Sequence, residues 1–270
     1  MPGSLRVSRS RPMFVARRRR RPWRLALATA AFLPLAWVAM PSGPSLPGGD
    51  GARVSPEVPQ AQPVLDPGER QALEAASPTE MFATFGDLEL YLPTESPVVV
   101  GFHEASTDGA LAIAPLGQVE SNDNTTKFEP PEEVEQGPGY RVMASRGRVH
   151  AATSAVDVVM RDDDPVRAPV SGTVTDVREY VLYGNHRDVR LEIMPDDAPE
   201  LRLVMIHIAE VEAEIGDEVR AGQTVLAGTA RPFPFGSQVD RFTEPDRWPH
   251  VHLEIKHEDD AAADEDDLGE

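Results

Sequence analysis

Residues 249–256 combine side chains that bind metals with a spacing that groups them. They read PHVHLEIK, and their apolar residues occur at every second position, a pattern that predicts a β-strand. Successive side chains of a strand point to opposite faces, so His250, His252 and Glu254 would share one face. Two imidazoles on a rigid strand could hold zinc, which leaves a position open for water in catalytic sites. The alternative is a half-exposed strand that merely carries two histidines.

Two further polar residues interrupt apolar runs. Asp157 lies within AVDVV, and a buried lone carboxylate is costly unless it is paired or coordinates a metal. His207 lies within VMIHI. An aspartate on the solvated face of an antiparallel strand and a hydrogen-bonded core histidine remain alternatives for these two residues. Because the chain has no cysteine, any metal would be held by His, Asp or Glu.

The charge is unevenly distributed along the 270 residues. Residues 1–24 contain nine arginines and no acid, which leaves 17 basic residues against all 45 acidic ones in residues 25–270. A surface that acidic repels phosphate groups, which argues against a nucleic-acid partner.

The N-terminal part of the sequence predicts export. The basic segment 1–24 precedes an uncharged apolar stretch at 25–40, which indicates a signal peptide or an N-terminal membrane anchor. Residues 41–84 are rich in proline and glycine and predict a linker. We therefore expect the rest of the chain to be extracytoplasmic, either secreted or anchored to the membrane by residues 25–40.

The rest of the sequence predicts an all-β fold, an antiparallel sheet or sandwich with disordered tails. Residues 85–139 would form an N-terminal β region with a polar loop at 118–139, and residues 258–270 an acidic disordered tail. Residues 140–257 would form the main module, because many short strands without helical periodicity are typical of sheets. The predicted strands of the two regions are 88–92, 98–102, 149–151, 155–160, 172–179, 189–194, 201–208, 224–227 and 250–256.

The order of these segments resembles that of M23-type zinc metallopeptidases, the LytM/lysostaphin-like cell-wall endopeptidases. The resemblance covers about residues 147–256. It rests on an aspartate strand followed by APVSGTV, then MIHI, GDEVRAGQ and PHVHLE, in the family's order. It implies the family's β fold, a Zn²⁺ cofactor, and hydrolysis of peptide bonds in peptidoglycan cross-links or stem peptides.

The family's functional residues carry over onto named positions. The resemblance implies that Asp157 and His252 bind zinc, and that His207 and His250 are non-ligand histidines that activate water and stabilise the oxyanion. The family's His-x-x-x-Asp motif would place the third ligand at position 153, where this chain has Thr153. The nearest upstream histidine, at position 150, is the predicted third ligand. The histidine at position 103 is a second candidate from outside the core module.

The missing histidine at position 153 and a second resemblance leave two other functions open. Without a third ligand, the chain would be a catalytically inactive M23-like domain that binds or regulates the cell envelope. The His207 segment also resembles the IIA phosphocarrier domain, which is phosphorylated on a histidine, although the predicted export and the His-x-His strand disfavour it. Residues 231–248 replace the family's short approach to His-x-His, so they would affect access of the substrate.

Overall fold

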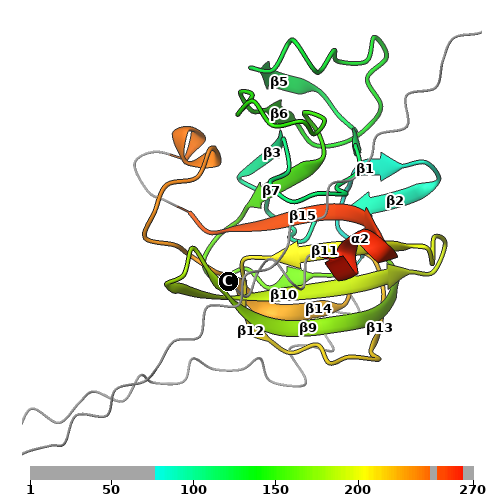
Figure 1. The fold of residues 1–270 in the computed structure, drawn as a ribbon. Helices are drawn as coiled ribbons and strands as arrows, with labels where there is room; N and C mark the ends of the chain where they lie inside the picture. Colours follow the sequence, from blue (N-terminus) through cyan, green and yellow to red (C-terminus); the bar gives the residue numbers. More distant parts are fainter. Residues whose placement is uncertain (1–76, 244–247, 264–270) are drawn as a thin grey trace, which may run out of the picture. The chain divides into compact units, whose positions relative to one another are not determined.

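The computed structural model describes residues 77–243 and 248–263 (Figure 1). These residues are mostly β-strands, which confirms the predicted all-β class. The helical elements of the described part are a short 3₁₀ helix, η1 (Val239–Phe242), and one α-helix, α2 (Glu258–Ala263). The basic segment 1–24, the apolar stretch 25–40, most of the predicted linker and residues 264–270 lie outside the described residues.

The main sheet has nine strands, and most neighbouring strands pair antiparallel. The exceptions are at one edge, where β6 (Tyr140–Val142) pairs in parallel with β3 (Val99–His103) and with β5 (Val119–Asn122). The predicted antiparallel sheet is therefore mixed at this edge. Figure 1 shows β15 (His250–His257) between β11 (Leu201–Ile206) and β7 (Ala155–Val159). In spatial order the strands are β13 (Glu218–Val219), β9 (Gly172–Leu182), β10 (His186–Pro195), β11 (Leu201–Ile206), β15 (His250–His257), β7 (Ala155–Val159), β3 (Val99–His103), β6 (Tyr140–Val142) and β5 (Val119–Asn122).

Two three-stranded sheets accompany the main one. The first comprises β2 (Leu88–Tyr91), β1 (Met81–Phe85) and β4 (Ala114–Pro115). The second comprises β12 (Ile208–Val211), β14 (Val225–Ala230) and β8 (Val166–Arg167). Side chains from all three sheets contribute to one buried apolar cluster, so a single core supports them.

The strand β15 shows how the core positions polar groups. Its apolar residues Val251, Leu253 and Ile255 are fully buried in the core, as the alternation predicts. The residues between them point to the opposite face. Each fully buried aliphatic side chain stabilises the fold by about 1.5–3 kcal/mol. The core therefore holds the histidine face of this strand in a fixed orientation.

Several predicted boundaries are wrong. The strand β1 begins inside the predicted linker, and β5 lies inside the predicted polar loop. The start of the acidic tail is the helix α2, because Ala261 is buried and the Arg202 guanidinium donates to Glu258 Oε1 at 2.5 Å. None of the helices in residues 77–243 and 248–263 is long and apolar enough to cross a membrane.

The predicted strand at residues 149–151 is absent from the described chain. Val149 is 91% exposed and therefore offers no apolar face to a sheet. The main-chain carbonyls of Arg148 and His150 accept hydrogen bonds from the Lys127 ammonium instead of pairing with a strand. A side chain thus satisfies carbonyls that a strand ladder would otherwise satisfy.

Candidate metal centre

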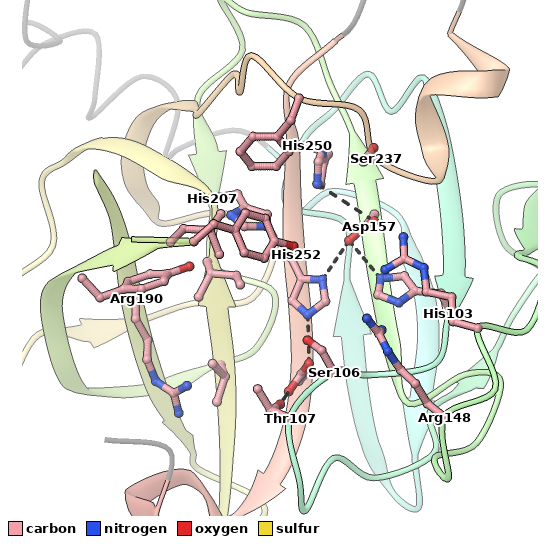
Figure 2. A pocket seen from close by; sticks show the side chains of 18 of the residues that line it. His103, Ser106, Thr107, Arg148, Asp157, Arg190, His207, Ser237, His250 and His252 are labelled. Atoms are coloured by element: carbon pink, nitrogen blue, oxygen red, sulfur yellow. Dashed lines mark hydrogen bonds and ion pairs between the residues drawn. The ribbon is translucent and has the colours of Figure 1, made fainter. Parts of the chain in front are cut away.

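Strand pairing brings three donor residues onto one face of the main sheet. Asp157 on β7 lies opposite His252 on β15 and opposite Gly101 on β3. Directly paired residues of neighbouring strands share a face, and so do residues two apart on one strand. His103 therefore projects on the same side as Asp157 and His252 (Figure 2).

The three side chains form a compact buried cluster. His252 Nδ1 lies 2.8 Å from Asp157 Oδ1, and His103 Nε2 lies 3.1 Å from the same oxygen. The three donor atoms all lie within 4.8 Å of one another, and each residue is 7% exposed or less. Two imidazole nitrogens and one carboxylate oxygen match the three-ligand sets of catalytic zinc sites.

The second nitrogen of each histidine has its own partner. His103 Nδ1 lies 3.0 Å from the main-chain carbonyl oxygen of Glu104, and His252 Nε2 lies 3.0 Å from Glu254 Oε1. With these nitrogens as N–H donors, the lone pairs of His103 Nε2 and His252 Nδ1 face Asp157. Ligand histidines in metal sites are held in this way. Two imidazole lone pairs thus converge on Asp157 Oδ1, so the residues fit a metal ion.

Without a metal ion, a proton on His252 balances the charge of the Asp157 carboxylate. Burial opposes ionisation of Asp157, but the nearby His103 and His250 outweigh it and hold the pKa of the carboxyl well below its usual value. Burial likewise opposes protonation of His252, but hydrogen bonds to Asp157 and Glu254 outweigh it and raise its pKa to about 10. A metal ion would therefore displace a proton when it binds.

His207 is oriented by a buried carboxylate. Its Nδ1 lies 2.7 Å from Asp188 Oδ2, and its main-chain N–H donates to the same oxygen at 3.2 Å. The residue has φ 68°, a left-handed conformation that is costly for a non-glycine residue. This conformation ends β11 and divides the strand predicted for residues 201–208. The main-chain hydrogen bond to Asp188 accompanies this conformation, and the contact through Nδ1 leaves Nε2 of His207 for the cavity.

His250 lies beside the cluster without joining it. Its Nε2 is 4.0 Å from Asp157 Oδ2, and its ring centroid is 5.1 Å from that of His207. Burial lowers the pKa of His250 to about 4, although the charge of Asp157 opposes the shift. The imidazole is therefore neutral near pH 7. Both histidines predicted to be non-ligands thus border the same cavity as the three donors.

The structure does not bring His150 into the cluster, in contrast to its prediction as the third ligand. Its Nε2 lies 3.6 Å from Asp108 Oδ1 instead. Residues 151–154 form a turn in which Ser154 N–H donates to the Ala151 carbonyl, and this turn carries His150 away from β7. His103, the second candidate, occupies the third position of the cluster because β3 pairs with β7. That pairing could not be read from the sequence.

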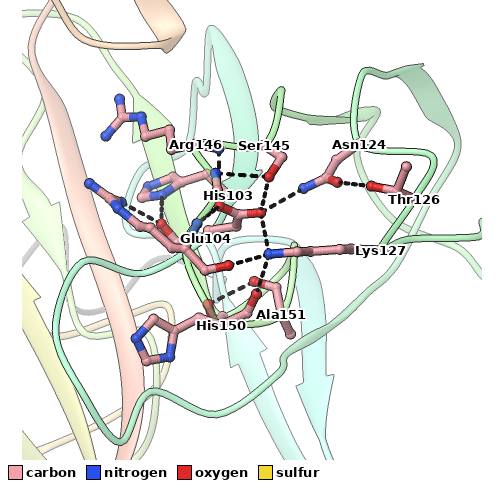
Figure 3. Close-up of polar contacts among 12 residues, drawn as sticks. His103, Glu104, Asn124, Thr126, Lys127, Ser145, Arg146, His150 and Ala151 are labelled. Atoms are coloured by element: carbon pink, nitrogen blue, oxygen red, sulfur yellow. Dashed lines mark hydrogen bonds and ion pairs between the residues drawn. The ribbon is translucent and has the colours of Figure 1, made fainter.

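The buried carboxylate of Glu104 fixes the surroundings of His103 (Figure 3). Burial opposes its ionisation, but hydrogen bonds outweigh this effect and lower the pKa of Glu104 to about 2. No feature of the sequence pointed to this network. The donors to Glu104 are Lys127 Nζ (2.7 Å), Ser145 Oγ (2.5 Å), Asn124 Nδ2 (3.3 Å) and the main-chain N–H groups of Arg146 and Arg148 (3.0 Å each).

A cavity of about 130 Å³ lies above the cluster. Phe235, Gly236 and Ser237, which precede the His-x-His strand, form part of its wall. The ring of Phe233 packs against His207 at 4.9 Å between centroids, and Phe235 stacks on Phe233 at 5.0 Å. Tyr183 contacts Phe235 at 5.3 Å. The residues Phe233 and Phe235 therefore form an aromatic cluster with Tyr183 beside His207.

No protein-family model and no curated protein matches the chain. Among solved structures, the solution structure of lysostaphin is 23% identical over 38% of this chain and 36% of that chain, with a TM-score of 0.28. The catalytic domain of lysostaphin from Staphylococcus simulans is 23% identical over 37% and 64%, with a TM-score of 0.26. A zinc-containing peptidase from Vibrio cholerae is 20% identical over 38% and 26%, also with a TM-score of 0.26. The matched part thus spans about a third of the length of lysostaphin.

Proposed function

We propose that this chain is a zinc metallopeptidase of the M23 type. The observation that carries the proposal is the convergence of His103 Nε2, Asp157 Oδ1 and His252 Nδ1 in one buried cluster, with His207 and His250 on the same cavity. The order of the motifs in the sequence supports the same family. The inactive alternative was suggested by Thr153, and His103 supplies the donor that this position lacks.

The side chains have the properties that peptide hydrolysis requires. A zinc ion held by such a donor set supplies Lewis acidity and makes water a stronger acid. Through Nδ1, His207 is hydrogen-bonded to Asp188, so its Nε2 can accept a proton from water and pass it to the leaving amine. Neutral His250 can donate a hydrogen bond to the oxyanion that develops on the scissile carbonyl. Phosphorylation of His207, the phosphocarrier alternative, would give the three-donor cluster no role.

We further propose that the substrate is a peptidoglycan cross-link or stem peptide, and that the enzyme works outside the cytoplasm. The resemblance of the motifs supports the substrate. The basic segment 1–24 and the apolar stretch 25–40 support export. The rings of Phe233 and Phe235, from the segment after residue 230, would offer apolar contacts to a peptide bound next to His207.

The test is hydrolysis of purified peptidoglycan by the full chain, followed through the release of free amines. We expect cleavage with one zinc per chain, its loss after chelation and its recovery when zinc is added back. The His252→Ala variant should neither bind zinc nor cleave. Stoichiometric zinc without any product would contradict the peptidase proposal and favour a domain that only binds the cell envelope.

A further inference from the structure

The wall of the cavity beside His103 carries two arginines in a chain whose net charge is −19. Arg146 and Arg148 line the same cavity as the three metal-donor residues. Figure 2 shows Arg148 beside His103, on the side away from His207. The wall next to His207 contains the rings of Phe235 and Tyr183. Arg190 also lines the cavity on that side, but its guanidinium is paired with Glu192. Among the described residues, the arginines of the cavity without a carboxylate partner therefore lie at the His103 end.

The main chain of both arginines is hydrogen-bonded to the residue that follows His103. Their main-chain N–H groups each donate to Glu104 Oε2 at 3.0 Å, and Glu104 directly follows His103 in the chain. The guanidinium of Arg148 donates through Nη1 to the Glu104 carbonyl oxygen at 2.7 Å, which accepts from His103 as well. The main chain of both arginines and the side chain of Arg148 are thus held by the same residue that orients a donor histidine.

Neither guanidinium forms an ion pair with a carboxylate within residues 77–243 and 248–263. The acids of the cavity already have partners, since Asp157 contacts two histidines and Glu254 accepts from Thr107 Oγ1 at 2.6 Å. Burial and the neighbouring charge of Arg146 lower the pKa of Arg148. The negative charges of Glu104 and Glu254 oppose this shift but form no ion pair with either guanidinium. Two guanidinium groups beside a cavity, without a carboxylate at ion-pair distance among the described residues, favour the binding of an anion.

We propose that Arg146 and Arg148 form a subsite for a free carboxylate of the peptide substrate, on the His103 side of the scissile bond. The inference rests on the proposed peptidase function and specifies the substrate class of that site. Planar guanidinium groups bind carboxylates with paired hydrogen bonds, which a neutral amide cannot replace. The carboxylate could be a side-chain group or the C-terminal group of the peptide.

The experiment compares two ligands and uses the zinc-loaded full chain. Soluble cross-linked peptides from purified peptidoglycan are supplied either in native form or with every carboxyl converted to an amide. We expect kcat/KM to be about 10-fold higher for the native peptides, carried by KM, which is the size of one charge-assisted hydrogen bond. Synthetic peptides that carry only a terminal or only a side-chain carboxylate then identify the source, and a preference for either supports the subsite.

The decisive variant is Arg146→Gln, because the Arg146 guanidinium makes no contact within the described residues that the fold would lose. We expect it to raise KM for the native peptides about 10-fold, to leave kcat unchanged, and to leave the amidated peptides unaffected. Arg146→Lys should retain most of the preference. Arg161→Gln, which removes an exposed arginine paired with Asp163, is the matched control and should leave it intact.

Two results would overturn the subsite while the peptidase function stands: equal kcat/KM for native and amidated peptides, or equal loss for both in Arg146→Gln. If wild-type protein cleaves neither ligand, the proposed function fails, and calorimetric titration of the same ligands decides the subsite separately. Carboxylate-selective binding that Arg146→Gln abolishes would support it. Equal or absent binding would overturn it.

Discussion

His103 and His207, at opposite ends of the cavity, are each oriented through Nδ1 of the ring, but by different partners. His103 contacts a main-chain carbonyl through Nδ1, whereas His207 contacts the buried carboxylate of Asp188. A carbonyl sets the tautomer and adds no charge. A carboxylate also stabilises the imidazolium that forms during proton transfer. The difference matches the proposed roles, in which His103 holds a cation and His207 moves a proton.

The buried acids behind these histidines act at different distances. Asp188 touches the His207 ring directly and also accepts from the Tyr180 hydroxyl at 2.5 Å. The Glu104 carboxylate instead accepts hydrogen bonds from the main chain of a neighbouring loop. The His103 ring is contacted by the main-chain carbonyl oxygen of Glu104 and not by this carboxylate. Substitution at Glu104 should therefore change the affinity for zinc, and substitution at Asp188 should change the rate.

The largest expected effect distinguishes the two candidates for the third ligand. His103→Ala removes a donor from the buried cluster and should weaken zinc binding by more than about 100-fold, beyond the loss seen when groups around a ligand are changed. His150→Ala should retain one zinc per chain. Elemental mass spectrometry of the full-chain variants measures both. Zinc lost in His150→Ala and kept in His103→Ala would reverse the assignment.

A smaller effect tests the proton-transfer end. Asp188→Asn keeps the shape of the side chain but removes the charge that orients and stabilises His207. We expect kcat for peptidoglycan hydrolysis to fall by about 10²–10⁴-fold with unchanged zinc content. Asp176→Asn, on the neighbouring strand β9, is a matched control and should leave kcat near the wild-type value. Loss of zinc in Asp188→Asn would show that the two ends are not separate.

At the opposite end, Glu104→Gln should lower zinc affinity by about 10-fold while kcat at saturating zinc stays near wild type. The amide group would turn an N–H₂ toward donors such as Lys127 Nζ, and we expect it also to lower the stability of the fold, because the partly buried Lys127 ammonium loses its carboxylate partner. Zinc titration against a competing chelator measures the affinity. Glu120→Gln, at an exposed ion pair with Arg141, is the control and should change neither quantity. A loss of kcat at saturating zinc would contradict a purely positioning role.

The smallest effect is the pH dependence of stability in the metal-free chain. The pKa of Asp188 is lowered from 3.8, because hydrogen bonds from His207 and Tyr180 outweigh the opposing effect of burial. A lowered carboxyl pKa stabilises the fold above the unfolded pKa, and this contribution is lost as pH falls through the folded pKa. The difference in unfolding free energy between wild type and Asp188→Asn should therefore be constant above about pH 5 and shrink below pH 3.8. Urea titrations from pH 7 to pH 3 measure it, and a difference that grows toward pH 3 would contradict the assignment.

The sequence by itself determined the all-β class and most strands, because alternation of apolar residues reports which face of a strand is buried. It also indicated His207, His250, Asp157 and His252, since costly polar groups in apolar runs are visible without a structure. The sequence before β7 led to one wrong prediction, that His150 is the third ligand. Neither Thr153 nor His150 lies in the cluster.

Only the tertiary structure decided which histidine completes the donor set and what surrounds it. The pairing of β3 with β7 joins residues 54 positions apart, from His103 to Asp157, and no local pattern encodes a register between distant strands. The buried roles of Glu104 and Asp188 could not be predicted for the same reason. Their hydrogen-bond donors come from distant parts of the sequence, and an acid without known donors is expected to be exposed to solvent. Long-range pairing places these polar residues around a cluster of side chains that could hold a metal ion.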